Sequence, residues 1–390
     1  MSSPLQQLLP LFERDQARHQ PLVLATLVRT DGSTYTKPGA HMLIAASGEY
    51  AGLLSGGCLE GDLAEHGRGV LATGIAKLAR YNSRGHEDLL FGLASGCEGT
   101  MDILLQRLDD ENDWQPLQRL ALAWRAQRAQ TLALVVKSTL PNMPAGSGAF
   151  AGDRQVFGLR AGAAIDQWTV ESLCRLAATL PHQGQNQFLP QALPGIDLLA
   201  LKQLPPTRLL LLGAGPDAQP VAELAAFLGW NVTVVDHRSQ YAQAERFPAA
   251  AAVLDRGPQA LDALLIGERT SAPVFGPRPT PFSAAIVMSH HLAMDLAYLQ
   301  SLAGSSIPYI GLLGPVARRE RLLAELAEAA AALRPRLRSP AGLDLGAVSP
   351  EAIALSIIAE IQAALAGRTK TGPLAQVRAS RPALEAQKGI

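Results

Sequence analysis

The spacing of apolar residues changes at residue 207, and this change limits the possible folds more than any other feature of the sequence. From that point short apolar runs alternate with helical stretches, the first helical stretch covering 220–229. The expected strands are 208–213, 231–236, 251–255, 284–289 and 307–314. Strands that alternate with helices predict a parallel sheet covered on both faces. We therefore expect the α/β fold class, with a Rossmann-like, doubly wound parallel sheet over residues 207–366.

The first expected strand runs directly into a glycine-rich turn, GAGPDA at 213–218, which opens a helix. The turn fits the dinucleotide fingerprint, because Gly213 allows the tight turn, Gly215 lets a phosphate approach and Ala218 permits close packing. Asp236 ends the next strand, where a ribose hydroxyl is met in such folds. The pattern predicts a site for a phosphate-bearing ligand, with NAD(P) or another nucleotide as one form. The alternative is a Rossmann scaffold that does not use its nucleotide site.

Open α/β sheets bind ligands beyond the carboxyl ends of their strands. Two adjacent histidines, His290 and His291, lie at such an end together with His237. Neighbouring strand residues point to opposite sides, so the histidine pair is not a metal motif. The cofactor-binding residues that we predict at this edge are Gly213, Gly215, Ala218, Asp236, Arg238, Ser289, His290 and Gly314.

The N-terminal part of the chain predicts a compact α+β unit over residues 1–110. Its expected elements are a helix over 3–18, strands over 21–30, 39–46 and 48–55, a helix after Gly57, and strands over 76–82 and 100–108. The second and third strands form an expected hairpin around Ser47-Gly48.

Residues 111–206 form a middle segment and linker region that we assign to the N-terminal domain. A helix is expected over 111–130 and a strand over 131–138, and the Pro-, Gln- and Gly-rich stretch 181–206 marks the domain boundary. A loose similarity between this segment and the start of the chain leaves open a duplicated hairpin. Residues 367–390 are polar and have no regular spacing of apolar side chains, and we predict that they form a flexible tail.

The sequence SGGCLE at 55–60 places two glycines, Gly56 and Gly57, between a strand and a helix, with Cys58 in the first helical turn. Backbone N–H groups and the helix dipole stabilise an anion there, whether a phosphate or the thiolate of Cys58 itself. Such a thiolate is a soft metal ligand or a carrier of activated sulfur. The alternative is a small buried cysteine that fills space.

Two further segments carry candidate binding residues. Cys97 lies between glycines in GCEG at 96–99. The run 29–39 is dense in hydrogen-bond donors, and Arg29, Ser33 and Lys37 are suited to a phosphate or to the polar edge of a pterin. The same residue types also favour a turn on their own, without any ligand. Cys174, within a helical stretch, is expected in the core.

Composition narrows the function classes. The 34 Lys and Arg residues balance the 34 Asp and Glu residues, which argues against a nucleic-acid partner because that needs a basic excess. No apolar run approaches the ~20 residues of a membrane span, and the N-terminus does not resemble a signal peptide. Three cysteines do not form a disulfide framework. We expect a cytoplasmic protein without a membrane partner.

Taken together, these segments resemble the XdhC/CoxI family. The N-terminal likeness is carried by VRTDGSTYTKPGAHMLI and GLLSGGCLEGDL. The C-terminal likeness is carried by LLLLGAGPDAQPVAELAAFLGWNVTVVDHR, VMSHHLAMDLAYL, PYIGLLGPVARRERLL and SPAGLDLGAVSPEAIALSIIAEI, in that order. The likeness covers most of residues 20–110 and 207–365, and the middle segment carries little of it.

The resemblance implies an accessory protein, more a cofactor chaperone than an enzyme with its own turnover. Such a protein binds molybdenum cofactor (molybdopterin), protects it during sulfuration and inserts it into a xanthine dehydrogenase-type molybdoenzyme. A cysteine desulfurase is the implied sulfur source, and a homodimer is the implied assembly. Cys58 is then the residue expected to act, as a molybdenum ligand or sulfur carrier. The alternatives are an NAD(P)-binding oxidoreductase and a non-catalytic adaptor between desulfurase and hydroxylase.

Overall fold

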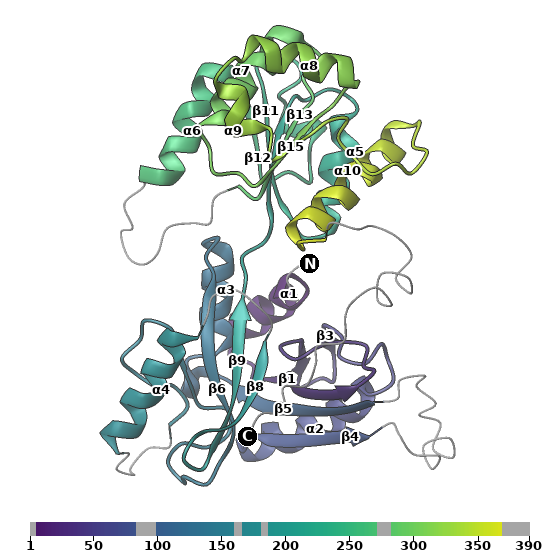
Figure 1. The fold of residues 1–390 in the computed structure, drawn as a ribbon. Helices are drawn as coiled ribbons and strands as arrows, with labels where there is room; N and C mark the ends of the chain where they lie inside the picture. Colours follow the sequence, from purple (N-terminus) through teal and green to yellow (C-terminus); the bar gives the residue numbers. More distant parts are fainter. Residues whose placement is uncertain (1–4, 83–98, 160–165, 181–185, 271–281, 369–390) are drawn as a thin grey trace. The chain divides into compact units, whose positions relative to one another are not determined.

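The computed structural model describes residues 5–82, 99–159, 166–180, 186–270 and 282–368 (Figure 1). The chain divides into two compact units, one spanning Ser3–Pro205 and the other beginning at Pro206. Each unit has its own sheets and its own hydrophobic core. The expected tail from 369 onward and Cys97 lie outside the described residues, so the structure does not bear on either.

The unit Ser3–Pro205 contains two antiparallel sheets. The first sheet has the order β3-β2-β1-β5-β4 and comprises β1 (Leu22–Gly32), β2 (His41–Ala45), β3 (Tyr50–Ala51), β4 (Lys77–Asn82) and β5 (Gly99–Leu108). The second sheet has the order β7-β6-β9-β8 and comprises β6 (Gln130–Ser138), β7 (Gly148–Phe150), β8 (Gln187–Leu193) and β9 (Ile196–Gln203). The helices are α1 (Leu5–Gln16), α2 (Glu60–Thr73), α3 (Leu117–Arg125) and α4 (Gln167–Thr179), with a 3-10 turn over Asp110–Asn112.

The two sheets repeat one arrangement of strands. The run β2-β1-β5-β4 matches the run β7-β6-β9-β8 strand for strand, and α2 and α4 occupy equivalent places in the chain order. Each long central strand also shifts register at the same point, between Leu27 and Arg29 in β1 and between Val135 and Lys137 in β6. The sequence left a duplication open, and the structure contains one, in which Arg29 and Lys137 occupy equivalent positions.

The stretch 181–206 differs from its expected role as a linker region. Its described part forms β8 and β9, which complete the second sheet. One proline of this stretch, Pro190, lies in β8 at the edge of the sheet, where a missing backbone N–H costs no ladder hydrogen bond. The helix expected over 111–130 is also shorter, because α3 begins only after Pro116.

Residues 22–28 of β1 and 131–136 of β6 are buried on both faces, which explains why these stretches are almost entirely apolar instead of alternating. Leu22 and Leu24 of β1 share one core with Leu132 and Leu134 of β6, with α1 and with α3. The intervening residues of β1 pack on the opposite face in a separate cluster that includes Leu63 of α2. The shared cluster joins the two repeats into one folding unit.

The unit beginning at Pro206 is a six-stranded parallel sheet, as expected. Its order is β12-β11-β10-β13-β14-β15, and the strands are β10 (Arg208–Leu212), β11 (Asn231–Asp236), β12 (Ala252–Asp255), β13 (Ala284–Val287), β14 (Tyr309–Leu312) and β15 (Leu337–Arg338). The helices are α5 (Ala218–Phe227), α6 (Pro258–Thr270), α7 (Leu292–Ala303), α8 (Val316–Glu325), α9 (Ala329–Leu333) and α10 (Pro350–Leu365), with a 3-10 turn over Ala244–Arg246. This is the strand order of Rossmann folds.

Helices cover both faces of the parallel sheet (Figure 1). Leu209 and Leu211 of β10 pack with α5 and α10, whereas Leu210 and Leu212 pack with α7 and α8. Within the described part of the chain, no helix combines the length and the apolar character that a membrane crossing requires.

We predict that Gly213→Ala destabilises this unit by roughly 2–3 kcal/mol, because Gly213 has a φ of +128° and an added Cβ would lie 2.4 Å from the carbonyl oxygen of Met288. Hydrogen–deuterium exchange of the β10 amides measures this loss. Gly346→Ala is the matched control, because Gly346 has a φ of +69° and open space around it. Equal losses of stability in the two variants would show that the close contact of Gly213 with the loop after β13 is unimportant.

Candidate functional site

The strand order reverses between β10 and β13, and open α/β sheets bind their ligands at the carboxyl ends of strands on either side of such a reversal. The loop after β10 and the loop after β13 meet there. The backbone of Gly213 is so close to Met288 and Ser289 that no side chain fits between them. The structure therefore brings together two of the loops that the sequence predicted as ligand-binding.

Asp217 and His290 are joined by a hydrogen bond between these two loops. Nε2 of His290 lies 2.8 Å from Oδ2 of Asp217, and His290 has a left-handed φ of +60° that aims it there. The other carboxylate oxygen lies against Gly215, 2.6 Å from where a Cβ would stand. A carboxylate thus covers the glycine that the fingerprint reserves for a phosphate. Asp217 makes no capping hydrogen bond to α5, so the start of this helix keeps its capacity for an anion.

Asp236 is fully buried and bound within the protein. Its carboxylate accepts a hydrogen bond from the N–H of Ala214 at 2.7 Å and two from the guanidinium of Arg238 at 2.8 and 2.9 Å. Burial raises the pKa of this carboxyl, but the hydrogen bonds from Arg238 and the backbone outweigh burial, so the net pKa lies below the ordinary value. Arg238 also stacks on the ring of Tyr241. The pair holds the glycine-rich turn to the end of β11.

Ser289 belongs to a second buried cluster, which sequence reasoning missed. Its hydroxyl donates to Asp295 of α7, and Asp295 is only 1% exposed. Arg318 of α8 donates to the other oxygen of Asp295 at 2.6 Å. Gly314 makes room for this arginine, because a Cβ would lie 2.8 Å from its Cδ. The cluster ties together the loops that follow β13 and β14.

The signal for Asp217, Asp295 and Arg318 was present in the sequence but weak. All three stand within the first few residues of helices that begin at the carboxyl edge of the sheet. Charged residues are common at helix starts, so position alone does not separate a buried pair from a solvated one.

The turn that holds Cys58 lies in the unit Ser3–Pro205 and is built around Glu60. The carboxylate of Glu60 is completely buried and accepts hydrogen bonds from backbone N–H groups of Leu54, Ser55, Gly57 and Leu59. The Ser55 hydroxyl adds a fifth at 2.7 Å. Burial raises the pKa of Glu60, but the hydrogen bonds lower this pKa by more than burial raises it, and the net direction is downward.

The position of Cys58 differs from the prediction. Helix α2 begins at Glu60, with Leu59 at its N-cap, so Cys58 precedes the helix instead of lying in its first turn. The anion that the turn binds is the carboxylate of Glu60, and this occupies N–H groups that we had assigned to a phosphate or a thiolate. Gly56 and Gly57 have φ values of +82° and +113°, which only glycine adopts readily, and Cys58 is exposed.

The donor-rich run 29–37 lies beside this turn. The Tyr35 ring is 3.6 Å from where a Cβ of Gly56 would stand, and the Thr36 hydroxyl donates to the carbonyl of Leu54 at 2.5 Å. Arg29, Ser33 and Lys37 are exposed, and Arg29 lies over the ring of Phe188. The structure thus brings the exposed thiol and the predicted donor run onto one part of this unit.

The remaining cysteine packs in the core, and the described residues form no metal cluster. Cys174 belongs to a buried cluster that includes residues of β6 and β9, as expected for a core residue, and burial raises the pKa of its thiol. No group of three His, Cys, Asp or Glu side chains in the described ranges converges as a metal site.

We predict that Asp236→Asn destabilises the parallel-sheet unit by roughly 1–3 kcal/mol at neutral pH, because Arg238 loses its charged acceptor. The folded-state pKa lies below the ordinary 3.8, so the carboxylate stabilises the fold above that pH and loses this effect as the pH falls through the folded value. The difference between variant and wild type should therefore shrink in acid. Asp255→Asn, at the exposed end of β12, is the control; denaturant unfolding at several pH values measures both.

We predict that Glu60→Gln loosens the Cys58 turn, because one acceptor oxygen is replaced by an NH2 group that faces N–H donors. The expected cost is roughly 2–3 kcal/mol, and exchange of the 54–59 amides should quicken. Glu65→Gln is the control on the same helix, since Glu65 forms a surface pair with exposed Arg68. Similar exchange rates in the two variants would contradict the role assigned to Glu60.

Two family models match the chain. The XdhC and CoxI family matches residues 15–82, and the XdhC Rossmann domain matches residues 209–361. A protein from Bacillus subtilis that is described as a probable xanthine dehydrogenase subunit is 32% identical over 343 residues, which cover 87% of this chain and 92% of that protein.

Two further likenesses span almost the whole chain. The molybdenum cofactor insertion chaperone PaoD of Escherichia coli is 23% identical over 380 residues, covering 90% of this chain and 94% of that protein. A crystal structure described as a xanthine dehydrogenase from Bacillus halodurans matches with a TM-score of 0.71 at 27% identity, covering 97% of this chain and 100% of that chain.

The fold and its edge loops define a two-unit protein in which a Rossmann sheet follows a duplicated α+β unit. This chain belongs to the XdhC and CoxI family.

Proposed function

We propose that this protein binds molybdenum cofactor and inserts it into a xanthine dehydrogenase-type molybdenum hydroxylase. The proposal rests on similarity over most of the chain to a molybdenum cofactor insertion chaperone and to a probable xanthine dehydrogenase subunit. In this role it protects the cofactor and supports its sulfuration, with a cysteine desulfurase as sulfur donor. The protein acts as a chaperone in the cytoplasm and works as a homodimer.

The chemistry of the described residues fits such a cofactor. Molybdopterin supplies a phosphate, a polar pterin ring and a metal held by soft sulfur ligands. Cys58 offers an exposed thiol on a turn that Glu60 holds in place, and soft thiolates suit such a metal. Arg29 and Lys37 offer exposed cations in the run beside it. The start of α5 has no side-chain cap, and it suits a phosphate that replaces the carboxylate of Asp217 as the partner of His290.

Retention of the cofactor by Cys58→Ala tests the proposal. Protein purified without oxygen from cells that make the cofactor should carry molybdenum and pterin in wild type, and at least about tenfold less in the variant, since a lost ligand costs about 1.4 kcal/mol or more. Cys174→Ala is the matched control, because Cys174 is a core thiol. Wild type without cofactor would sink the proposed function, whereas equal retention in Cys58→Ala would remove only this residue.

A second measurement separates the two roles of Cys58. After incubation with a cysteine desulfurase and cysteine, a sulfur carrier gains one sulfur atom at Cys58, detected by mass spectrometry of the peptide. A metal ligand gains none, yet still loses cofactor on substitution.

The alternative of an NAD(P)-binding oxidoreductase is favoured by the Rossmann strand order and the turn at 213–218. Against it, Asp236 already uses both carboxylate oxygens on Ala214 and Arg238. Titration with NADH, followed by its fluorescence, distinguishes the two functions, because an oxidoreductase binds it at micromolar concentration. The third alternative, an adaptor, predicts binding of the desulfurase and hydroxylase by protein that carries no pterin.

A further inference from the structure

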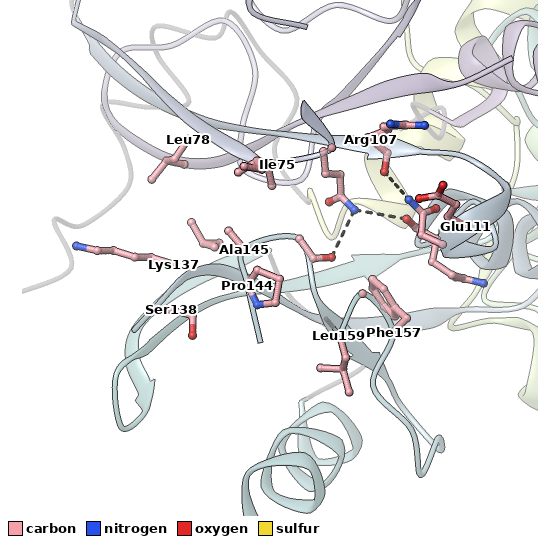
Figure 2. Close-up of a pocket in the computed structure, with 18 of the residues that line it drawn as sticks. Ile75, Leu78, Arg107, Glu111, Lys137, Ser138, Pro144, Ala145, Phe157 and Leu159 are labelled. Carbon is pink, nitrogen blue, oxygen red and sulfur yellow. Dashed lines mark hydrogen bonds between the residues drawn. The ribbon is translucent and has the colours of Figure 1, made fainter. Parts of the chain in front are cut away.

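A pocket of about 760 Å³ opens in the unit Ser3–Pro205 (Figure 2). It lies where the end of α2 and the strands β4 and β5 approach the end of β6 and the loops 140–146 and 157–159. The described residues of the candidate site do not line it. Its volume falls in the range of protein sites that take up a group of drug-like size.

The duplication gives this pocket an equivalent place in the first repeat, which contains the sheet of β1 to β5. Counted from the register shift that the two repeats share, Leu104 of β5 is equivalent to Leu199 of β9. Their partners on the neighbouring strands, Leu78 of β4 and Phe188 of β8, are therefore equivalent as well.

The loops beside the two places also correspond. Gly146 donates its N–H to the carbonyl of Val135 at 2.9 Å, and Gly39 donates in the same way to the carbonyl of Leu27 at 2.7 Å. Both glycines have a φ of +91°. The loop after β6, which borders the pocket, is therefore the equivalent of the donor-rich run after β1.

In the first repeat, side chains of the second sheet fill this place. The guanidinium carbon of Arg29 lies 5.3 Å from the centre of the Phe188 ring. The side-chain amide of Asn186 donates to the carbonyl of Pro38 at 3.0 Å. A cation over an aromatic ring and an amide N–H on a loop carbonyl thus connect the loop to the sheet.

The second repeat lacks the ring and the amide but keeps the cation. Leu78 stands where the first repeat uses Phe188. Two positions earlier on the strand side, Ala76 stands in the place of Asn186. Lys137 is exposed and makes no hydrogen bond or ion pair with another residue in the part of the chain that the structure describes. The pocket is therefore the place where an aromatic group and an amide are missing.

The walls around this place are apolar. Ile75 and Leu78 lie on one side, and Pro144, Ala145 and Phe157 lie across from them (Figure 2). Ile75 is 57% exposed and Leu78 is 41% exposed, although both are large aliphatic residues. Apolar walls that face each other across an open space suit a flat ring, which would cover both.

The pocket also has buried acceptors without a donor. Gln106 is only 6% exposed, and its amide nitrogen donates to the carbonyls of Gln115 and Gly146 at 3.4 and 3.5 Å. The side-chain oxygens of Gln106 and Gln115 have no partner among the described residues. Buried acceptors of this kind are rare unless a donor outside the protein satisfies them. Each residue of a polypeptide backbone other than proline supplies such an N–H donor.

These groups lie within reach of one short segment. The amide of Gln106 contacts the carbonyl of Gly146, and the N–H of Gly146 contacts the carbonyl of Val135. Lys137 follows two residues later, about 7 Å along the strand. An extended segment of three residues spans about 10 Å, so its backbone and one side chain reach both Gln106 and Lys137.

We propose that this pocket docks an aromatic side chain of a partner protein, presented on an extended backbone segment. The ring lies between the apolar walls with one face towards Lys137, as Phe188 lies beneath Arg29 in the first repeat. Backbone N–H groups beside the ring donate to the side-chain oxygens of Gln106 and Gln115. The partner thus supplies the ring and the amide that the second repeat lacks.

Titration of the full chain with blocked pentapeptides, followed by saturation-transfer NMR, tests the proposal. A peptide with phenylalanine between glycines should bind at millimolar concentration. Its leucine analogue should bind at least about fivefold more weakly, because leucine offers Lys137 no ring face. Benzyl alcohol has the ring without backbone N–H groups, and it should also bind at least about fivefold more weakly.

Leu78→Phe is the most specific variant, because it restores the ring that the first repeat has at this place. It should weaken binding of the phenylalanine peptide at least about tenfold, since the new ring occupies the pocket. Leu122→Phe, at a similarly exposed position on α3 outside the pocket, is the matched control and should have no effect. Exposed positions of this kind tolerate substitution without unfolding.

A second pair of variants tests the cation. Lys137→Ala should weaken the phenylalanine peptide about threefold and leave the leucine peptide unchanged, whereas Lys137→Arg should keep the preference for the ring, since arginine also lies over aromatic rings. A pentapeptide that carries benzoylphenylalanine should crosslink on irradiation to residues within 74–78 or 140–146, as read by mass spectrometry.

The proposal is overturned if the leucine peptide binds as tightly as the phenylalanine peptide, if Leu78→Phe leaves the affinity unchanged, or if the crosslinks lie elsewhere. Benzyl alcohol that binds as tightly as the peptide would also overturn it and would assign the pocket to a small aromatic molecule. The docking surface does not rest on the cofactor proposed for the Cys58 turn, so molybdenum retention and these titrations decide separate claims.

Discussion

Buried carboxylates that bind backbone N–H groups hold the loops at the strand ends in both units. Glu60 gathers four N–H groups of the Cys58 turn, and Asp236 fixes the N–H of Ala214 to the end of β11. Asp295 does the same for Ser289, with Arg318 as counter-charge. A buried carboxylate is tolerated only when such donors surround it, so each loop has one arrangement that satisfies its charge. The exposed groups, Cys58 and His290, lie on loops that these hydrogen bonds hold in place.

Much of the architecture could be predicted from the spacing of apolar residues in the sequence. Strands β10 and β13 were predictable because they are short apolar runs, and β11 because it is rich in valine and threonine and lies between Gly229 and the polar residues after Asp236. The second antiparallel sheet was harder, since β8 contains Pro190 and polar residues that an edge strand tolerates but a sequence pattern assigns to a loop. The two-residue strand β15 is too short to leave a periodic signal.

The sequence predicted where the candidate sites lie, but it did not predict which groups contact each other there. The glycines at 56–57 and 213–215 marked turns where anions bind, and such turns do occur there. The sequence did not reveal which anion fills each turn, because Glu60, Asp217 and Asp236 are ordinary acidic residues in sequence and become ligands of the loops only after folding. A pocket in the unit Ser3–Pro205 had no sequence signal, since its walls come from four separate segments, 74–78, 106–115, 136–146 and 157–159 (Figure 2).

The hydrophobic layer common to both repeats has a consequence for dissecting the protein. Leu22 and Leu24 are covered in part by Leu132 and Leu134, which lie more than a hundred residues later. An excised fragment that ends at residue 82, where the N-terminal family match stops, would leave this layer open to water. The segment that carries the family likeness is therefore smaller than the unit that folds together, and truncation studies should keep the chain intact through Pro205.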